Sequence, residues 1–169
     1  FREAPGHRPC IDGQAWDWDG VRFEMLHPQP ADYDKPARKA NDMSCVLKVS
    51  AAQGSALLTG DIETISEQAL SKRQGERLRA EVLLAPHHGS RTSSSPEFIA
   101  AVAARTVIFP VGYRNRFRHP NAEVLRRYEA TGAQLLRTDR DGAVTVSLGA
   151  VPRRLTFERE ARRRYWHGQ

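Results

Sequence analysis

Three side chains that could bind a metal or move a proton follow two short apolar runs. Asp61 comes after residues 56–60, and the pair His87 and His88 comes after residues 82–86. A neutral imidazole suits zinc or manganese, whereas a protonated imidazole suits a phosphate oxygen or a leaving group. This combination predicts a metal-dependent hydrolase. The histidine pair alone is weak evidence, because adjacent residues of a strand point to opposite faces and only one need enter a site.

Asp61 has two interpretations that its spacing does not separate. Its carboxylate could bridge two divalent ions at a sheet edge, where Gly60 allows the backbone to approach closely. It could instead cap the helix that follows, because aspartate is a favoured cap and suits the helix dipole. Ser90 opens a hydroxyl-rich stretch that could orient an anion, but such a stretch is equally typical of a loop with exposed backbone.

The segment at 112–120 interleaves cations with aromatic rings around Asn115 and His119. The cations are Arg114, Arg116 and Arg118, and the rings are Tyr113 and Phe117. This composition is typical of a surface that grips phosphates and stacks bases. If the segment is extended, alternation places the three arginines on one side. The alternative is a solvated loop.

The residues around these candidates predict alternating strands and helices. Asp19-Gly20 is a favoured two-residue turn, so 16–26 should form a hairpin, and a second hairpin should join 44–50 to 56–59. Residues 27–43 should form a surface loop. The other expected elements are helices at 63–74, 97–104 and 120–131 and strands at 81–85, 106–111, 133–137 and 143–148, the last two around 139–142. This order predicts an α/β fold with helices packed on mixed sheets.

Composition limits the chain to one sizeable core. With 169 residues, 40% of them hydrophobic, one domain is expected, and no apolar run of about 18 residues occurs that could span a membrane. The first residues do not resemble a signal peptide, and the missing initiator methionine suggests a chain taken from something longer. Cys10 and Cys45 lack zinc-ribbon spacing, and whether they form a disulfide depends on an oxidising compartment.

The net charge of +6 is concentrated at the carboxyl end, where residues 152–169 hold six arginines against two glutamates. A basic arm of this kind can hold phosphates by releasing counterions. A solvated terminus is the other interpretation. We therefore separate a domain at 1–150 from a basic tail at 151–169.

Five segments, taken in order, resemble a known family. They are residues 41–47, 58–63 with Glu67, 86–90, 111–115 with His119-Pro120, and 137–139 with Gly142. Together they resemble the metallo-β-lactamase-like domain of ComEC, the inner-membrane DNA-uptake channel of natural competence. The similarity covers roughly residues 16–148.

The resemblance implies an αββα sandwich with a zinc or manganese site between two sheets, and hydrolysis of the DNA strand that is not imported. It makes Asp61 the bridging ligand and one of His87 and His88 a metal ligand, with His87 favoured, while the other histidine contacts the phosphate. Asn115 and His119 line the same rim as ligand, proton donor or substrate contact. The residues expected to bind single-stranded DNA are Ser90, Arg114, Arg116 and Arg118. The other implied partner is the rest of the membrane channel, with this domain in the periplasm.

The chain also departs from the family pattern. The main ligand cluster of the superfamily, written HxHxDH or HxDxDH, does not occur in these 169 residues. We expect the chain to be the second half of the domain with at most a partial site, because a catalytic zinc usually has three protein ligands. Alone, it should be inactive or nearly so. A missing half would also expose a sheet edge and an apolar face, which predicts self-association or a compensating contact.

Two other functions stay open at this stage. One is a noncatalytic DNA-binding or assembly module of the same channel, in which the histidines are remnants. The other is a metallo-hydrolase of small phosphoesters or lactones, for which the basic charge is incidental. A DNA affinity that falls steeply with salt would argue against the second.

Overall fold

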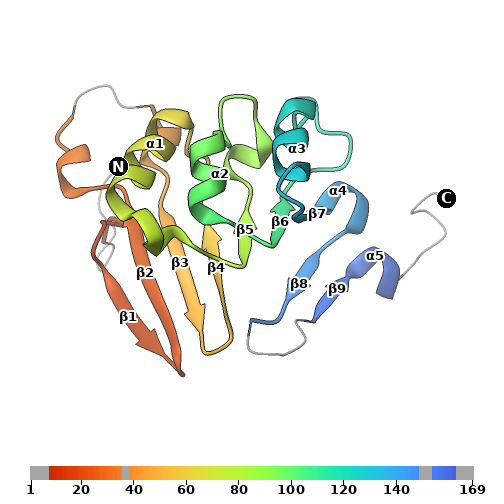
Figure 1. The fold of residues 1–169 in the computed structure, drawn as a ribbon, viewed down its shortest axis with the longest axis horizontal. Coiled ribbons are helices and arrows are strands. Elements are labelled where there is room, and N and C mark those ends of the chain that lie inside the picture. Colours follow the sequence, from red (N-terminus) through yellow and green to blue (C-terminus); the bar gives the residue numbers. More distant parts are fainter. Residues whose placement is uncertain (1–7, 36–38, 149–153, 163–169) are drawn as a thin grey trace.

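The computed structural model describes residues 8–35, 39–148 and 154–162, which form a mixed α/β fold around a seven-stranded sheet (Figure 1). The strands, which lie side by side in chain order, are β1 (Ala15–Trp18), β2 (Val21–His27), β3 (Val46–Ala51), β4 (Gly54–Leu58), β5 (Val82–Leu84), β6 (Thr106–Phe109) and β7 (Gln134–Arg137). Neighbours from β1 to β4 are antiparallel, and those from β4 to β7 are parallel. The predicted α/β class is confirmed.

Both predicted hairpins are present. Asp19 and Gly20 join β1 to β2 with positive φ angles of 49° and 76°, as a two-residue turn that matches the twist of its strands requires. The second hairpin joins β3 to β4 with Ala51 opposite Gly54. The predicted surface loop between the hairpins contains two short 3-10 helices, η1 (Pro30–Asp32) and η2 (Asn41–Met43).

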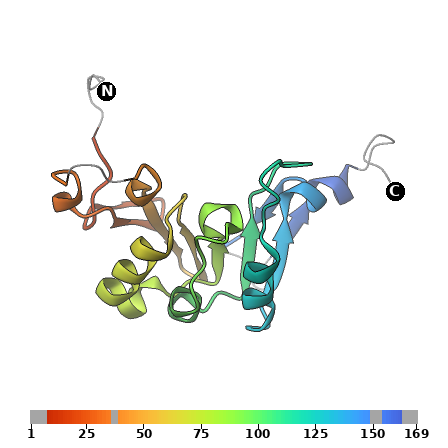
Figure 2. The same ribbon diagram turned by 90° about the horizontal axis from the view of Figure 1, so that it is seen from above.

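Three helices lie between the parallel strands and cover one face of the sheet, as Figures 1 and 2 show. They are α1 (Thr64–Gln74), α2 (Pro96–Val102) and α3 (Ala122–Glu129); the short η3 (Gly75–Leu78) follows α1. The main core lies between the helices and the sheet and includes the buried residues Leu57, Leu83, Val107, Leu70, Phe98 and Val124. The predicted helix from Pro120 begins slightly later, because the side chain of Asn121 accepts a hydrogen bond from the backbone of Glu123 and caps α3.

The last two predicted strands lie in separate sheets. The short helix α4 (Thr138–Asp141) follows β7 directly, because the Asp141 carboxylate accepts a 2.7 Å hydrogen bond from the backbone N–H of Arg137 and closes a helical turn. Strand β8 (Val144–Val146) therefore pairs with β9 (Leu155–Phe157), which leads into α5 (Glu158–Ala161). Part of the predicted tail is thus a strand and a helix. The rest of it, 151–153 and 163–169, lies outside the described residues, and its phosphate binding stays a prediction.

The second face of the sheet is apolar and only partly covered. The hairpin β8–β9 packs over the end of this face that carries Val82, Ile108 and Leu136. Strand register and alternation place further apolar side chains on the same face of β1 to β4, where they are exposed or half-buried: Trp16, Trp18, Phe23, Met25, Leu47, Val49 and Leu58. Trp18 is 73% exposed. The exposed apolar face expected from the sequence is therefore present among the described residues.

A buried carboxylate joins the helices to one another. Glu67 of α1 is 0% exposed, and its two oxygens accept hydrogen bonds of 2.5 and 2.8 Å from the backbone N–H groups of Ser94 and Ser95 at the start of α2. The hydroxyl of Tyr128 in α3 bonds to Ser94 Oγ at 3.1 Å. Burial raises the pKa of Glu67, against the effect of these backbone donors. Glu67 and Ser94 together thus link α1, the start of α2 and α3.

Glu67→Gln is expected to destabilise the protein by about 1–3 kcal/mol, because an amide NH2 group would then face a backbone N–H that has lost its acceptor. The pKa of Glu67 is raised in the folded protein. Its contribution to the free energy of unfolding is therefore present at acid pH and is lost as the pH rises through the folded-state pKa. The difference in unfolding free energy between the two proteins should therefore narrow toward neutral pH. Urea unfolding at several pH values measures both effects.

The matched control is Glu129→Gln, which removes an exposed carboxylate at the end of α3. It should leave the urea midpoint nearly unchanged. Equal midpoints for the Glu67 variant and the wild type would contradict the structural role given to the buried carboxylate.

Candidate functional site

Asp61 lies just beyond the end of β4, on a loop that is held close to the start of β3. Its backbone N–H donates to Ser44 Oγ at 3.0 Å, and a Cβ on Gly60 would lie only 2.8 Å from the Cβ of Ser44. The side chain of Asp61 is 41% exposed, so the carboxylate faces outward from the core. The helix-capping interpretation does not hold, because the N-cap of α1 is Glu63.

His87 and His88 lie in a turn rather than on a strand. The short η4 (Pro86–Gly89) follows β5, and within it the two histidines have positive φ angles of 47° and 57°. Their ring centroids are 6.4 Å apart. The alternation rule for strands therefore does not apply here, and both rings, rather than one, lie near the same sheet edge.

His88 makes the closest contact with Asp61. Its Nδ1 lies 2.7 Å from the carbonyl oxygen of Pro110, which can only accept, so this nitrogen carries the proton. The other nitrogen, Nε2, lies 3.3 Å from Asp61 Oδ1. A neutral His88 would direct a lone pair at the carboxylate, so the contact becomes favourable when a second proton or a shared cation lies between them. A backbone carbonyl that fixes the tautomer in this way is common behind metal-binding histidines.

His87 faces a different carboxylate. Its Nδ1 is buried and lies 3.3 Å from Glu63 Oε1, without a hydrogen bond of good geometry among the described residues. Burial raises the pKa of Glu63, but hydrogen bonds from Thr92 and Asn41 and the charge of Lys39 outweigh it and bring the pKa below its ordinary value. Glu63 therefore stays ionised beside His87.

His119 completes the group of imidazoles. Its ring centroid is 5.9 Å from that of His87. Its backbone is held by Asn115, whose side chain accepts from His119 N–H and donates to His119 O, each at 2.8 Å. Burial and the neighbouring His87 and His88 lower the pKa of His119, while Asp61 opposes them. His119 is therefore neutral at pH 7 and can accept a proton or an ion.

These side chains suit a divalent cation only in part. Asp61 and His88 offer a carboxylate and an imidazole across 3.3 Å, which fits two ligands of zinc or manganese. Within 8–35, 39–148 and 154–162, however, no three His, Cys, Asp or Glu side chains are arranged to hold an ion together. The expectation that the chain holds only part of a metal site stays a prediction.

The loop between β6 and α3 forms the wall of a pocket of about 250 Å³ beside these groups. The pocket is lined by His88, Pro110, Val111, Gly112, Asn115, Phe117 and His119. The loop is not extended, because it folds into turns in which Arg114 and Arg118 have positive φ angles of 54° and 56°. The condition under which alternation would place the three arginines on one side is therefore not met, although Arg114, Arg116 and Arg118 are all exposed.

Ser90, the remaining predicted substrate contact, is buried at 8% exposure, and its hydroxyl lies 3.1 Å from that of Thr92. Its role as a substrate contact stays a prediction. Sequence reasoning did not select Ser44, Glu63 or Pro110 as site residues. Glu63 carried a signal, since it lies two residues after Asp61. Ser44 and Pro110 carried none, because their contacts depend on the fold.

A disulfide joins the amino-terminal segment to the strand region beside the Asp61 loop. Cys10 and Cys45 are bonded, with Cα atoms 6.0 Å apart, so the pairing left open by the sequence is formed. Cys45 follows Ser44 directly, and Ser44 holds the Asp61 loop. The disulfide therefore anchors the amino-terminal segment beside the loop of Asp61.

Gly89 allows the histidine turn to pack against the core. Its φ is 78°, and a Cβ there would lie 2.7 Å from Pro120 Cβ and 2.8 Å from Phe109 Cδ1. Gly132 has a similar φ of 74° but nothing within 4 Å of its Cβ position. A comparison of substitutions at the two glycines therefore measures the cost of backbone strain apart from the cost of crowding.

Gly132→Ala is expected to cost about 1–2 kcal/mol, from the left-handed backbone alone. Gly89→Ala should cost roughly 1–3 kcal/mol more, because the added methyl overpacks the contact with Pro120 and Phe109. Chemical denaturation of both variants gives the comparison. Equal losses would show that the turn is not pressed against the core as described.

Comparison with known proteins adds evidence that is independent of this geometry. No family model matches the chain. The chain is 37% identical over 163 residues to "Uncharacterized protein YcaI" of Escherichia coli (strain K12), covering 96% of this chain and 21% of that protein. It is 42% identical over 144 residues to "Competence protein ComA" of Neisseria gonorrhoeae, covering 85% and 20%.

A relative from Bacillus subtilis (strain 168), "ComE operon protein 3", is 36% identical over 124 residues, covering 73% of this chain and 15% of that protein. The chain thus spans about a fifth or less of the length of these relatives. The similarity extends over most of the present chain and joins it to a protein named for competence. Over the matched residues, the chain is therefore a homologue of one part of longer proteins that include "Competence protein ComA".

Proposed function

We propose that this chain acts in DNA uptake during competence, as part of a metal-dependent nuclease that degrades the DNA strand that is not imported. The observation that carries the proposal is the meeting of Asp61, His87, His88 and His119 at one edge of the sheet. A relative named as a competence protein supports the process in which this chemistry would operate.

The residues have separate roles in this proposal. Asp61 and His88 hold zinc or manganese, and His87 is the further candidate ligand, with the remaining ligands supplied from outside this chain. The metal, when bound, supplies Lewis acidity toward a phosphate oxygen. His119, neutral and held by Asn115, takes or gives a proton at the reacting oxygens. Arg114, Arg116 and Arg118 bind phosphates of the strand.

We also propose that the sheet is one half of an αββα sandwich of the metallo-β-lactamase type. The support is the apolar face of β1 to β4, whose side chains are typical of a surface packed against a second sheet. The parent protein would lie in the inner membrane with this domain in the periplasm. The disulfide agrees with an oxidising compartment. Among the described residues, none of the helices is both long and apolar enough to cross a bilayer.

A second candidate is a noncatalytic DNA-binding or assembly module. It is favoured by the absence of three grouped metal ligands within the described residues. A hydrolase of small phosphoesters would need neither the exposed arginines nor a long substrate surface, so the geometry supports it less. If a substitution of Asp61 abolishes degradation of the DNA strand, the nuclease proposal is supported over the noncatalytic module.

The exposed sheet face is expected to make the isolated chain self-associate. Trp18→Lys should reduce this association, because it places a charge on the apolar face. Ile65→Lys is the matched control, since Ile65 is 72% exposed on α1 against 73% for Trp18 on the sheet face. Sedimentation velocity over a range of concentrations measures the effect. Equal association of both variants would place the contact elsewhere.

The catalytic role is tested in a competence protein of full length. This chain is exchanged for the matched segment of the Neisseria gonorrhoeae protein, and Asp61→Asn is compared with the unchanged chimera. We expect Asp61→Asn to lower degradation of single-stranded DNA by about a hundredfold or more, because it removes a charged ligand. Asp17→Asn, on the first hairpin, is the control. Unchanged degradation with Asp61→Asn would reject the metal-nuclease proposal and leave the binding module.

A further inference from the structure

Two aromatic side chains of the β6–α3 loop are left in solvent. Tyr113 is 66% exposed and Phe117 is 65% exposed, whereas Phe98, Phe109 and Tyr128 are buried in the core. Large exposed aromatic rings cost free energy in water, so two of them on one loop point to a binding surface.

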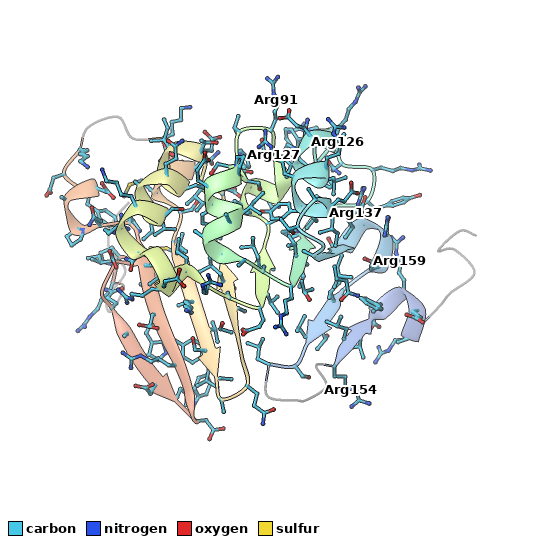
Figure 3. All side chains as sticks on the ribbon, viewed as in Figure 1. Arg91, Arg126, Arg127, Arg137, Arg154 and Arg159 are labelled. Carbon is cyan, nitrogen blue, oxygen red and sulfur yellow. A yellow bond between two sulfur atoms is a disulfide. The ribbon has the colours of Figure 1, made fainter. Side chains whose placement is uncertain are left out.

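Each exposed ring lies next to arginine. The guanidinium carbon of Arg114 is 5.2 Å from the centroid of Tyr113, and that of Arg116 is 4.9 Å from the centroid of Phe117. Arg159 comes from α5, far along the chain from this loop, and its guanidinium carbon is 5.5 Å from the centroid of the Tyr113 ring. Figure 3 shows Arg159 beside α5 and Arg126 on α3, so this side of the molecule carries further positive charge.

Hydrogen bonds within the loop hold its backbone in a defined shape. The backbone N–H of Asn115 donates to Gly112 O at 3.2 Å, and that of Arg118 donates to Asn115 O at 3.3 Å. The side chain of Asn115 closes the loop on His119. A surface that is preformed loses less conformational entropy on binding.

The platform of rings continues into the candidate site. Phe117 stacks on His119 with centroids 5.9 Å apart and an interplanar angle of 16°. Phe117 also lines the pocket that contains His88 and His119. A base stacked on Phe117 would therefore place its own phosphate near these imidazoles.

We infer that Tyr113 and Phe117 form a stacking platform that holds single-stranded DNA by its bases at the rim of the site. The inference rests on the proposed function and adds how the strand is gripped. Aromatic rings accept every base by its face, and the adjacent arginines accept its phosphates, so binding is tolerant of sequence. A duplex keeps its bases stacked inside and cannot use the rings.

The test measures binding of the 169-residue chain to a fluorescein-labelled oligothymidine of about 15 nucleotides, with EDTA present so that no cleavage occurs. Tyr113→Leu and Phe117→Leu keep an apolar side chain but remove the ring. Each substitution is expected to raise the Kd roughly tenfold, and the double variant should raise it roughly a hundredfold. Trp18→Leu, which removes an equally exposed ring from the sheet face, should leave the Kd unchanged.

The salt dependence of DNA binding distinguishes the contribution of base stacking from that of phosphate contacts. The leucine variants should keep the slope of log K against log salt, whereas Arg116→Gln should reduce its magnitude by about 0.7, the value for one phosphate of a single strand. Wild-type affinity in both leucine variants, or equal affinity for a duplex of the same sequence, would overturn the inference. Because binding is measured without metal or cleavage, its failure is distinct from failure of the nuclease proposal.

Discussion

The parallel register of β4, β5 and β6 is the constraint on which the site depends. Leu57, Leu83 and Val107 are paired across these strands, and each is completely buried beneath the helices. Parallel strands end at the same edge of a sheet, so the loops that follow them meet there. A slip by one residue would turn these leucines and the valine to the other face and would move all three loops. The packing of apolar side chains thus sets the distance between Asp61 and His88.

The site combines one open carboxylate with several imidazoles held in fixed orientations. The carboxylate of Asp61 is open to solvent and lies beside the half-exposed ring of His88, whereas Glu63 is enclosed by hydroxyl, amide and imidazole groups. The outward carboxylate is therefore the one accessible to an ion or a substrate, whereas the enclosed carboxylate lies 3.3 Å from His87. In the proposed function, Asp61 would thus be the metal-binding carboxylate and Glu63 a neighbouring charge.

Much of the fold could be predicted because the local signals agree with it. Asp19-Gly20 requires the turn that it forms, and the apolar runs before Asp61 and His87 become β4 and β5. Strand β8 was predicted, but its pairing with β9 was not, because nothing local in the chain reveals that the Asp141 carboxylate closes a helical turn on Arg137. The conformation of the arginine loop was missed for a similar reason, since the bonds from Asn115 to His119 depend on the folded loop.

The two crowded glycines have a consequence for how substitution data from this family are interpreted. Gly60 lies against Ser44, and Gly89 lies against Pro120 and Phe109, so each marks a place where the backbone itself fills the space of a side chain. In a scan scored by activity alone, replacements at these glycines would rank beside those at Asp61 and His88, although neither glycine takes part in the chemistry. A parallel measurement of protein abundance would distinguish the two groups, because variants of the glycines lose folded protein whereas variants of Asp61 and His88 do not.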